Sequence, residues 1–256
     1  MQNLQGQVAL VTGSAQGIGK AIALRLAQEG ADIVIVDRND DSRAEEVLGE
    51  IKALGRRVVV DAGDIGRVDD IQRIIRDSAA QLGRLDILVN NAGIEHNASF
   101  IDIAEADYDA VLDVNLKGTF FMTQAFVRHL RSANRPGRII NVSSVHEELP
   151  FPHFTTYCAS KGGLKMLMRN LAIELAPFGI TVNNIAPGAI ETPINTRLMH
   201  SPELLKALIG NIPLGRLGKP EDVAGMAAYL AGPDAAYVTG ATMVVDGGLL
   251  WNYSEQ

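Results

Sequence analysis

The sequence predicts an α/β protein with a doubly wound parallel sheet and helices on both faces. Short apolar runs alternate with longer segments of helical period along the chain, an alternation typical of parallel strands joined by helices. A glycine-rich loop directly follows the first apolar run and opens the first helical segment. Because such crossovers are right-handed, we expect ligands to bind at the carboxyl ends of the strands.

The predicted strands are short apolar runs, most of them rich in the β-branched residues that suit a buried sheet. In chain order they are Val8–Thr12, Ile33–Val36, Arg57–Val60, Leu85–Val89, Arg138–Val142, Ile180–Ile185 and Thr242–Val245. The segments between them have helical spacing of apolar residues, and glycine follows two of them as a C-cap signal, at Gly55 and Gly83. These predicted helices are Gly17–Gly30, Ser42–Leu54, Val68–Leu82, Glu105–Val114, Thr119–Leu130, Thr155–Ala176 and Glu221–Leu230.

We expect one domain over residues 1–256, because no internal repeat or low-complexity linker interrupts this pattern. Its cofactor half covers about residues 1–150, and its catalytic and substrate half covers about residues 151–256. The looser, proline-rich stretch Pro187–Pro220 has turn residues and short helical segments. Its length favours a substrate lid over a plain surface loop.

The composition is that of an ordinary soluble globule, with 47% hydrophobic and 21% charged residues. The formal net charge of −7, with no block of basic residues, argues against binding to nucleic acid. No apolar run reaches the roughly 20 residues of a membrane span, and the amino-terminal residues lack a signal-peptide pattern. Cys158 is the single cysteine, so a reducing compartment fits best, and we expect a cytoplasmic protein that does not associate with membranes.

The glycine-rich loop predicts a dinucleotide site. Its glycines allow a tight turn and a close approach of the backbone to a pyrophosphate, while the helix amino terminus supplies free N–H groups. The spacing is Gly-x-x-x-Gly-x-Gly, which differs from the commonest dinucleotide fingerprint. The predicted binding residues in this loop are Gly13, Ser14, Gln16, Gly17, Ile18 and Gly19.

Asp37 closes the second predicted strand, about twenty residues after the glycine loop. A carboxylate there accepts hydrogen bonds from the adenosine ribose hydroxyls and repels a 2′-phosphate, which predicts NAD over NADP. Arg38 is adjacent and could pair with a phosphate, so NADP use stays possible. Asp64 and Ile65 follow the third strand, where Asp64 is placed to contact the adenine.

Further cofactor contacts are expected at the ends of the fourth and sixth strands. Small residues after the fourth strand let the cofactor lie against the sheet, and a Pro-Gly turn ends the sixth strand near the expected nicotinamide position. The residues predicted to bind there are Asn91, Ala92, Gly93, Pro187, Gly188, Ile190 and Thr192.

Tyr157 and Lys161 are the most informative pair in the chain. A four-residue spacing places both side chains on one helix face, one turn apart. A phenol has a pKa of about 10, and a nearby cation lowers that pKa, so the pair could form an acid/base group usable near neutrality. The pair would also contact the cofactor, and Ser144 lies thirteen residues before the tyrosine.

Together these motifs resemble the short-chain dehydrogenase/reductase family over essentially the whole chain. The resemblance implies a single seven-stranded Rossmann domain, and members of the family are commonly homotetramers. It implies catalytic roles for Asn115, Ser144, Tyr157 and Lys161: Tyr157 exchanges the proton, Lys161 lowers the tyrosine pKa, and Ser144 binds the substrate oxygen. Asn115 would hold a water molecule that links Lys161 to solvent.

A narrower resemblance, over residues 90–95, 141–152 and 187–195, is to the glucose 1-dehydrogenases of bacteria. Asp37 departs from this subgroup, which often lacks an acid there. The resemblance implies hydride transfer from a sugar or alcohol, with D-glucose oxidised to gluconolactone. Candidate substrate-binding residues near strand ends are Glu95, Ser144, His146 and Asn195, although all but Ser144 could equally be loop or cap residues. The remaining histidines show no ligand spacing, so no catalytic metal is expected.

Two alternatives compete with this interpretation. A 3-oxoacyl-thioester reductase, or another alcohol or ketone dehydrogenase of the same family, would favour NADPH, against which Asp37 counts. A non-catalytic dinucleotide-sensing regulator could keep the glycine loop while losing the tyrosine, whereas here the full catalytic set is present.

The two helices Thr119–Leu130 and Leu164–Leu175 carry more apolar side chains than one sheet face needs. We therefore expect them to pair with a second copy in a symmetric homotetramer. Packing on the sheet is the alternative. The residues concerned are Phe120, Phe121, Phe126, Leu164, Leu167, Met168 and Leu171.

Overall fold

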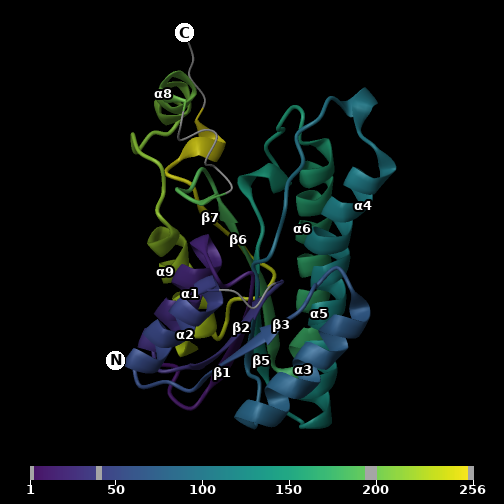
Figure 1. Ribbon diagram of the computed structural model, residues 1–256, viewed down its shortest axis with the longest axis vertical. Coiled ribbons are helices and arrows are strands. Elements are labelled where there is room, and N and C mark those ends of the chain that lie inside the picture. The colour runs from purple at the N-terminus through teal and green to yellow at the C-terminus, as the bar shows by residue number, and fades with distance from the viewer. Residues whose placement is uncertain (1–2, 39–41, 194–200, 253–256) are drawn as a thin grey trace.

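The computed structural model describes residues 3–38, 42–193 and 201–252. Seven strands form one parallel sheet in the order β3-β2-β1-β4-β5-β6-β7, with helices on both faces, which confirms the predicted fold class (Figure 1). The strands are β1 (Val8–Thr12), β2 (Asp32–Asp37), β3 (Val58–Ala62), β4 (Ile87–Asn90), β5 (Gly137–Val142), β6 (Ile180–Pro187) and β7 (Thr242–Val245).

The strand order reverses its direction between β1 and β4, because β1 pairs with β2 on one side and with β4 on the other. In a doubly wound sheet, such a reversal opens a crevice at the carboxyl ends of the strands. The loops that follow β1 and β4 therefore flank the natural ligand position of this fold.

The helices divide between the two sheet faces, with α1, α2 and α9 on one face and α3, α5 and α6 on the other (Figure 1). The longer helices are α1 (Gly17–Gln28), α2 (Ser42–Ala53), α3 (Val68–Leu82), α4 (Glu105–Leu112), α5 (Thr119–Ser132), α6 (Thr155–Leu175), α8 (Pro202–Gly210) and α9 (Pro220–Ala231). The short helical turns are η1 (Phe100–Asp102), η3 (Val145–Glu147), η4 (Ala176–Phe178), η6 (Pro233–Ala235) and η7 (Leu249–Trp251).

The central strands are buried on both faces, which explains their continuous apolar runs. In β1, Ala9 and Val11 pack into the core beneath α1 and α9, whereas Val8 and Leu10 pack into the core on the opposite face. Successive side chains of a strand point to opposite faces, so a strand covered on both sides needs apolar residues at every position.

A π-helix, η2 (Asp113–Gly118), joins α4 to α5. The sequence predicted two separate helices with an interruption between residues 114 and 119, whereas the structure continues helically through this turn. Gly118 is needed there because a Cβ at this position would lie 2.6 Å from the carbonyl oxygen of Ile65. The π-helix thus packs directly against the loop after β3, and π-turns of this kind are frequent at functional sites.

The apolar excess expected on α5 and α6 is smaller than predicted. Phe126, Leu164 and Met168 are buried and so are not available to a second copy, while Phe121 and Leu171 are partly buried against the core. Phe120, from the predicted set, is exposed, and so are three apolar side chains outside that set, Met166, Ile173 and Phe178.

The segment after β6 carries the short helix α8 and returns to the body of the protein at an isolated parallel bridge between Ile190 and Gly218. This agrees with the short helical segments predicted for residues 187–220. Nowhere in the described ranges is a helix both long enough and apolar enough to cross a bilayer.

Candidate functional site

The glycine loop between β1 and α1 forms a cradle in which side chains would not fit. Gly13 has φ +63°, and a Cβ there would lie 2.9 Å from Ala92 Cα. A Cβ at Gly19 would lie 2.1 Å from the carbonyl oxygen of Gly13. No side chain in the described ranges caps the amino terminus of α1 at Gln16, so the first N–H groups of the helix face the loop. This arrangement fits a pyrophosphate.

The polar side chains of the glycine loop make hydrogen bonds within the protein and so help to hold the fold. Ser14 Oγ donates to the Val11 carbonyl (2.8 Å) and accepts from the Val36 amide (3.2 Å), which ties β1 to β2. Gln16 Oε1 accepts a hydrogen bond from Arg43 (2.8 Å). The backbone of these two residues therefore remains the part best placed to contact a cofactor.

Asp37 lies where the sequence predicted an acid, at the end of β2 beside the glycine loop. Its carboxylate accepts hydrogen bonds from the Ala15 amide (3.1 Å) and the Arg38 amide (2.8 Å). The Arg38 side chain is 78% exposed and lies 3.9 Å from Asp64 Oδ2, so its charge is directed toward Asp64. Asp64 Oδ1 accepts from the Gly66 amide (2.9 Å), whereas the Ile65 side chain is buried in the core and can offer only its backbone.

The turn after β4 is fastened to the glycine loop. Asn91 Nδ2 donates to the carbonyl oxygens of Thr12 (2.9 Å) and Gly13 (3.0 Å), and the Ala92 amide donates to Thr12 Oγ1 (3.1 Å). At Gly93, a Cβ would lie 3.3 Å from Asn115 Oδ1 and 3.7 Å from Lys161 Nζ. The absence of a side chain at Gly93 therefore lets the cofactor loop approach the predicted catalytic residues.

The carboxyl end of β6 closes the same rim. The Gly188 amide donates to the Val245 carbonyl (3.0 Å), and Ile190 is buried beyond the Pro187–Gly188 turn. A Cβ at Gly17 would lie 3.6 Å from Thr192 Cγ2, so Thr192 faces the glycine loop across the crevice. The predicted cofactor residues from β1, β4 and β6 are thus brought to one edge of the sheet.

The four predicted catalytic side chains converge from three elements. Tyr157 and Lys161 come from α6, Ser144 from the start of η3, and Asn115 from the π-helix. Ser144 lies close enough to Tyr157 to lower the pKa of its hydroxyl. Lys161 Nζ donates to the Val142 carbonyl (3.0 Å), in a position that is almost fully buried.

Asn115 uses its side chain to hold the turn after β4. Its Oδ1 accepts from the Ile94 amide (2.9 Å), and its Nδ2 donates to the Ile94 carbonyl (2.9 Å) and to Ser160 Oγ (3.1 Å). Asn115 therefore links the cofactor loop to α6, and it has a structural role that the sequence did not predict.

The expected lowering of the tyrosine pKa is absent in the protein alone. Burial raises the pKa of Tyr157 to about 12, the hydrogen bond from Ser144 opposes this rise, and the charge of Glu95 adds to it. Burial also lowers the pKa of Lys161 to about 8, while the charge of Glu147 acts in the opposite direction. The two groups are desolvated together, so the protein environment favours a neutral phenol.

Two of the predicted substrate residues lie beside the tyrosine. Glu95 is half-buried, its pKa is raised by burial, and its side chain has no hydrogen-bond or ion-pair partner within the described ranges. The His146 ring stacks on Phe151 (4.3 Å between centroids) and lies edge-on to Tyr157 (6.2 Å). Asn195 lies outside the described residues.

His146 is held in one tautomer. Its Nδ1 lies 3.0 Å from the Leu149 carbonyl oxygen, which can only accept, so Nδ1 carries the hydrogen and Nε2 is an acceptor in the neutral ring. Burial lowers the pKa of His146, which favours this neutral form. The ring can therefore accept a hydrogen bond from a hydroxyl group.

A buried row of amides beneath the site was missed by the sequence reasoning. Asn90, Asn141 and Asn184 occupy paired positions on β4, β5 and β6. Hydrogen bonds of 2.9–3.2 Å connect them in series and end on the carboxylate of Glu147. Asparagine within or at the end of an otherwise apolar strand was the signal that could have revealed this row.

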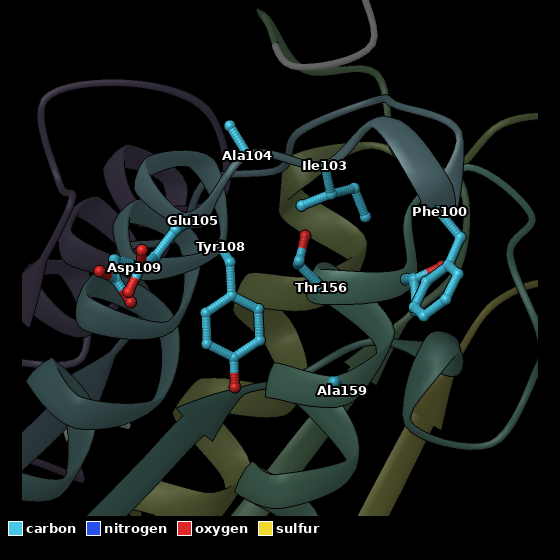
Figure 2. Close-up of a pocket in the computed structure, with 9 residues that line it drawn as sticks. Phe100, Ile103, Ala104, Glu105, Tyr108, Asp109, Thr156 and Ala159 are labelled. Atoms are coloured by element: carbon cyan, nitrogen blue, oxygen red, sulfur yellow. The ribbon is translucent and has the colours of Figure 1, made fainter.

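One surface pocket, with a volume of about 530 Å³, lies between α4 and the start of α6 (Figure 2). Tyr108, Ile103 and Phe100 point into it, and Thr156 forms part of its wall. None of the predicted catalytic or cofactor residues lines this pocket, so it is separate from the crevice at the strand ends. In the described ranges, no group of three or more His, Cys, Asp or Glu side chains is arranged to hold a metal ion.

Comparisons with known proteins agree with this geometry. A family model described as "Enoyl-(Acyl carrier protein) reductase" matches residues 13–250. The chain is 42% identical to 3beta-hydroxysteroid dehydrogenase 1 of Eggerthella lenta, covering 96% of this chain and 95% of that protein. It is 41% identical to Glucose 1-dehydrogenase 2 of Bacillus subtilis, covering 97% and 96%.

A solved structure of a gluconate 5-dehydrogenase from Burkholderia cenocepacia, in complex with NADP and tartrate, is similar with a TM-score of 0.93. The two sequences are 36% identical, and 98% of each chain is covered. Matches over nearly the full length, together with the glycine cradle and the convergent Ser144, Tyr157 and Lys161, settle the family. The chain belongs to the short-chain dehydrogenase/reductase family and is an NAD(P)-dependent oxidoreductase that acts on CH–OH groups.

Proposed function

We propose that this protein is a glucose 1-dehydrogenase that oxidises D-glucose to gluconolactone. The observation that carries the proposal is the Glu95 carboxylate, which is half-buried, lies near enough to Tyr157 for its charge to raise the tyrosine pKa, and has no partner in the described part of the chain. An unpaired buried polar group costs about 1–3 kcal/mol, and hydroxyl groups of a sugar would satisfy it. The similarity to the Bacillus subtilis glucose dehydrogenase supports the same substrate.

The proposed roles follow from the positions of the side chains. Tyr157, as phenolate, removes the proton of the substrate hydroxyl, and Ser144 donates a hydrogen bond to the same oxygen, where negative charge develops. When bound, the oxidised nicotinamide supplies the hydride acceptor and a positive charge. The ammonium group of Lys161 supplies a positive charge beneath the Tyr157 ring, and Asn115 keeps the cofactor loop in place beside it.

A polyol also needs acceptors at its other hydroxyl groups. The fixed tautomer of His146 offers Nε2 for this purpose, and Glu95 offers both carboxylate oxygens. Two acceptors near one tyrosine suit a substrate with several hydroxyl groups.

We propose that NAD is the preferred cofactor, although NADP can also bind. The Asp37 carboxylate lies beside the glycine loop, where it would accept hydrogen bonds from the ribose hydroxyls and repel a 2′-phosphate. The exposed guanidinium of Arg38 could offset part of that repulsion. The similar gluconate dehydrogenase structure contains NADP, so both cofactors belong in the assay.

A 3β-hydroxysteroid is the competing substrate class. The rings of His146, Phe151 and Phe154 form a continuous stack, with centroids 4.3 and 4.0 Å apart, next to Tyr157. Such a stack offers an apolar surface to a flat alicyclic substrate. The similarity to the Eggerthella lenta enzyme favours this alternative.

The test is a spectrophotometric assay of the purified protein with saturating NAD or NADP. We expect reduced cofactor to form with D-glucose, faster with NAD, and the activity to vanish in Tyr157→Phe while the variant still binds NADH. If a 3β-hydroxysteroid is oxidised and glucose is not, the hydroxysteroid replaces glucose as the proposed substrate. If no sugar yields reduced cofactor, the proposal that the protein oxidises glucose is wrong.

We further propose a cytoplasmic homotetramer. The single cysteine suits a reducing compartment. Exposed apolar side chains on α5 and α6, including Phe120, Met166 and Ile173, supply an unpartnered surface for a second copy.

A further inference from the structure

We propose that Glu147 is a positioning residue, whose buried carboxylate fixes the turn that carries Ser144 and sets a negative charge opposite Lys161. The proposal concerns a residue outside the predicted catalytic set, and its catalytic consequences rest on the proposed function of the same site. Glu147 lies in η3, three residues after Ser144.

The Glu147 carboxylate is almost completely enclosed by donors. Its side chain is 1% exposed. One oxygen accepts from Asn184 Nδ2 (3.2 Å) and from the Ser143 hydroxyl, and the other accepts from Thr242 Oγ1 (2.9 Å). The ammonium of Lys165 lies 3.6 Å from this second oxygen. Three of these groups donate hydrogen bonds and the fourth is a cation, a partner set that suits an acceptor-only carboxylate.

The carboxylate also sets the direction of the buried amide row. Because it can only accept, Asn184 must present its NH₂ group to it and its Oδ1 to the neighbouring strand. Asn141 then donates to Asn184 and accepts from Asn90, so every amide in the row donates toward Glu147. Hydrogen bonds that all point in one direction strengthen one another by polarisation. Without the Glu147 charge, nothing would fix the direction of this row.

This network reaches the proposed catalytic residues in two ways. Ser143, which donates to Glu147, accepts from the Ser144 amide (2.5 Å) and so fixes the backbone next to the Ser144 hydroxyl. Glu147 is also paired with Lys165 (3.6 Å), which lies one helical turn from Lys161 on α6, and its charge opposes the lowering of the Lys161 pKa by burial.

Among the described residues, no other group near Lys161 supplies this negative charge. Tyr157 lies on the same helix as Lys161, and the charge of Glu95, after β4, acts on the pKa of Tyr157. Strand β5 places only the neutral carbonyl of Val142 next to Lys161. Lys165, one helical turn further on α6, is itself paired with Glu147 and Glu148. No second carboxylate therefore replaces Glu147 opposite the buried lysine in the described part of the chain.

The test compares Glu147→Gln with Glu148→Gln. Both changes remove one negative charge next to Lys165, but Glu148 makes none of the contacts with Ser143, Asn184 or Thr242. We expect Glu147→Gln to lower kcat about tenfold or more with little change in the KM for the cofactor. The falling limb of its oxidation pH profile, where Lys161 loses its proton, should move to lower pH, whereas Glu148→Gln should stay close to wild type.

Wild-type kcat and pH profile in a folded Glu147→Gln protein would overturn the proposal. If Glu147→Gln does not fold, Thr242→Val serves instead, because it removes one contact and keeps the buried charge. A smaller fall in kcat in Thr242→Val would support the positioning role, and unchanged kcat would contradict it.

A second measurement does not depend on enzyme activity. Denaturation midpoints at neutral pH are compared for Glu147→Gln in the wild-type and Lys161→Met backgrounds. We expect Glu147→Gln to lower the midpoint more in the wild-type background, where Lys161 loses its counter-charge. Glu148→Gln should lower the midpoint equally in the two backgrounds. Equal falls for Glu147→Gln would refute the charge role, even if no substrate is ever turned over, so this result separates the inference from the proposed function.

Discussion

Lys161 Nζ lies 5.4 Å from the centroid of the Tyr157 ring. The ammonium therefore sits beneath the aromatic face while it donates its hydrogen bond elsewhere, to the carbonyl oxygen of Val142 (3.0 Å). Both groups are desolvated, and each pKa moves toward the neutral form, to about 12 for Tyr157 and about 8 for Lys161. The protein alone thus holds a neutral acid, and a further positive charge in the site would be needed to favour the phenolate.

Removing the Ser144 hydroxyl should move the pH dependence of oxidation to higher pH. The hydrogen bond from Ser144 lowers the pKa of Tyr157, so its loss in Ser144→Ala lets burial raise that pKa further. Oxidation requires the phenolate, and we expect the rising limb of the kcat/KM profile to lie at higher pH in the variant than in the wild type. The check is kcat/KM for oxidation between about pH 6 and pH 10. Coincident profiles would show that Ser144 does not act on the tyrosine.

Replacing Lys161 with methionine should stabilise the protein at neutral pH. Burial lowers the pKa of Lys161 from 10.5 to about 8, so between these values the unfolded chain binds a proton that the folded chain does not. Above pH 10.5 the lysine carries no charge penalty, and below pH 8 the full penalty applies, roughly 3 kcal/mol at 1.36 kcal/mol per pKa unit.

The free energy of unfolding of Lys161→Met should therefore exceed that of the wild type most below pH 8, and the excess should shrink as pH rises toward 10.5. The lost hydrogen bond to Val142 offsets part of the gain, by about 1 kcal/mol. Urea denaturation of both proteins across this pH range measures the difference. A difference that does not change with pH would contradict the prediction.

Neutralising Asp37 should weaken the preference for NAD. In Asp37→Asn the repulsion of a 2′-phosphate disappears, and we expect the ratio of kcat/KM for NADP to that for NAD to rise about tenfold, equivalent to about 1.4 kcal/mol. Asp64→Asn is the matched control, since it also removes one carboxylate near Arg38 but does not contact the glycine loop. An equal change in both variants would mean that Asp37 acts only through overall charge.

Glu95→Gln should weaken substrate binding and lower the pKa of Tyr157. The charge of Glu95 raises that pKa, so its removal should move the rise of kcat for oxidation to lower pH. The KM for glucose should rise about tenfold, because an amide replaces a carboxylate that accepts substrate hydroxyls. Steady-state kinetics at several pH values measure both effects. Glu105→Gln, in the first turn of α4, provides a control that should change neither.

A charge on the exposed face of α6 should break the proposed tetramer. Ile173 is 77% exposed, so Ile173→Glu can fold as a monomer while it places a carboxylate in an apolar interface. Light scattering after size exclusion should show a smaller assembly for this variant. Leu204→Glu, on α8, carries the same change on another exposed surface and should keep the wild-type assembly. A monomeric wild type would remove the interface altogether.

The sequence determined the sheet, the helix order and the glycine cradle, because these depend on local signals. Continuous apolar runs such as Val8–Thr12 identify strands buried on both faces, and Gly13 and Gly19 mark positions where a side chain cannot fit. The family motifs predicted that Ser144, Tyr157 and Lys161 lie near one another, and the structure places them so, because Ser144 follows a strand end and the other two share one helix face.

The tertiary structure alone decided the electrostatics. Neither the raised pKa of Tyr157 nor the burial of Lys161 could be predicted from a four-residue spacing, because desolvation depends on everything packed around a group. Likewise, the link from Asn184 on β6 to Glu147 on η3 joins residues that are 37 positions apart in the chain. Local sequence fixes which groups are present and on which elements, whereas only packing fixes how much water each group loses and which partner replaces it.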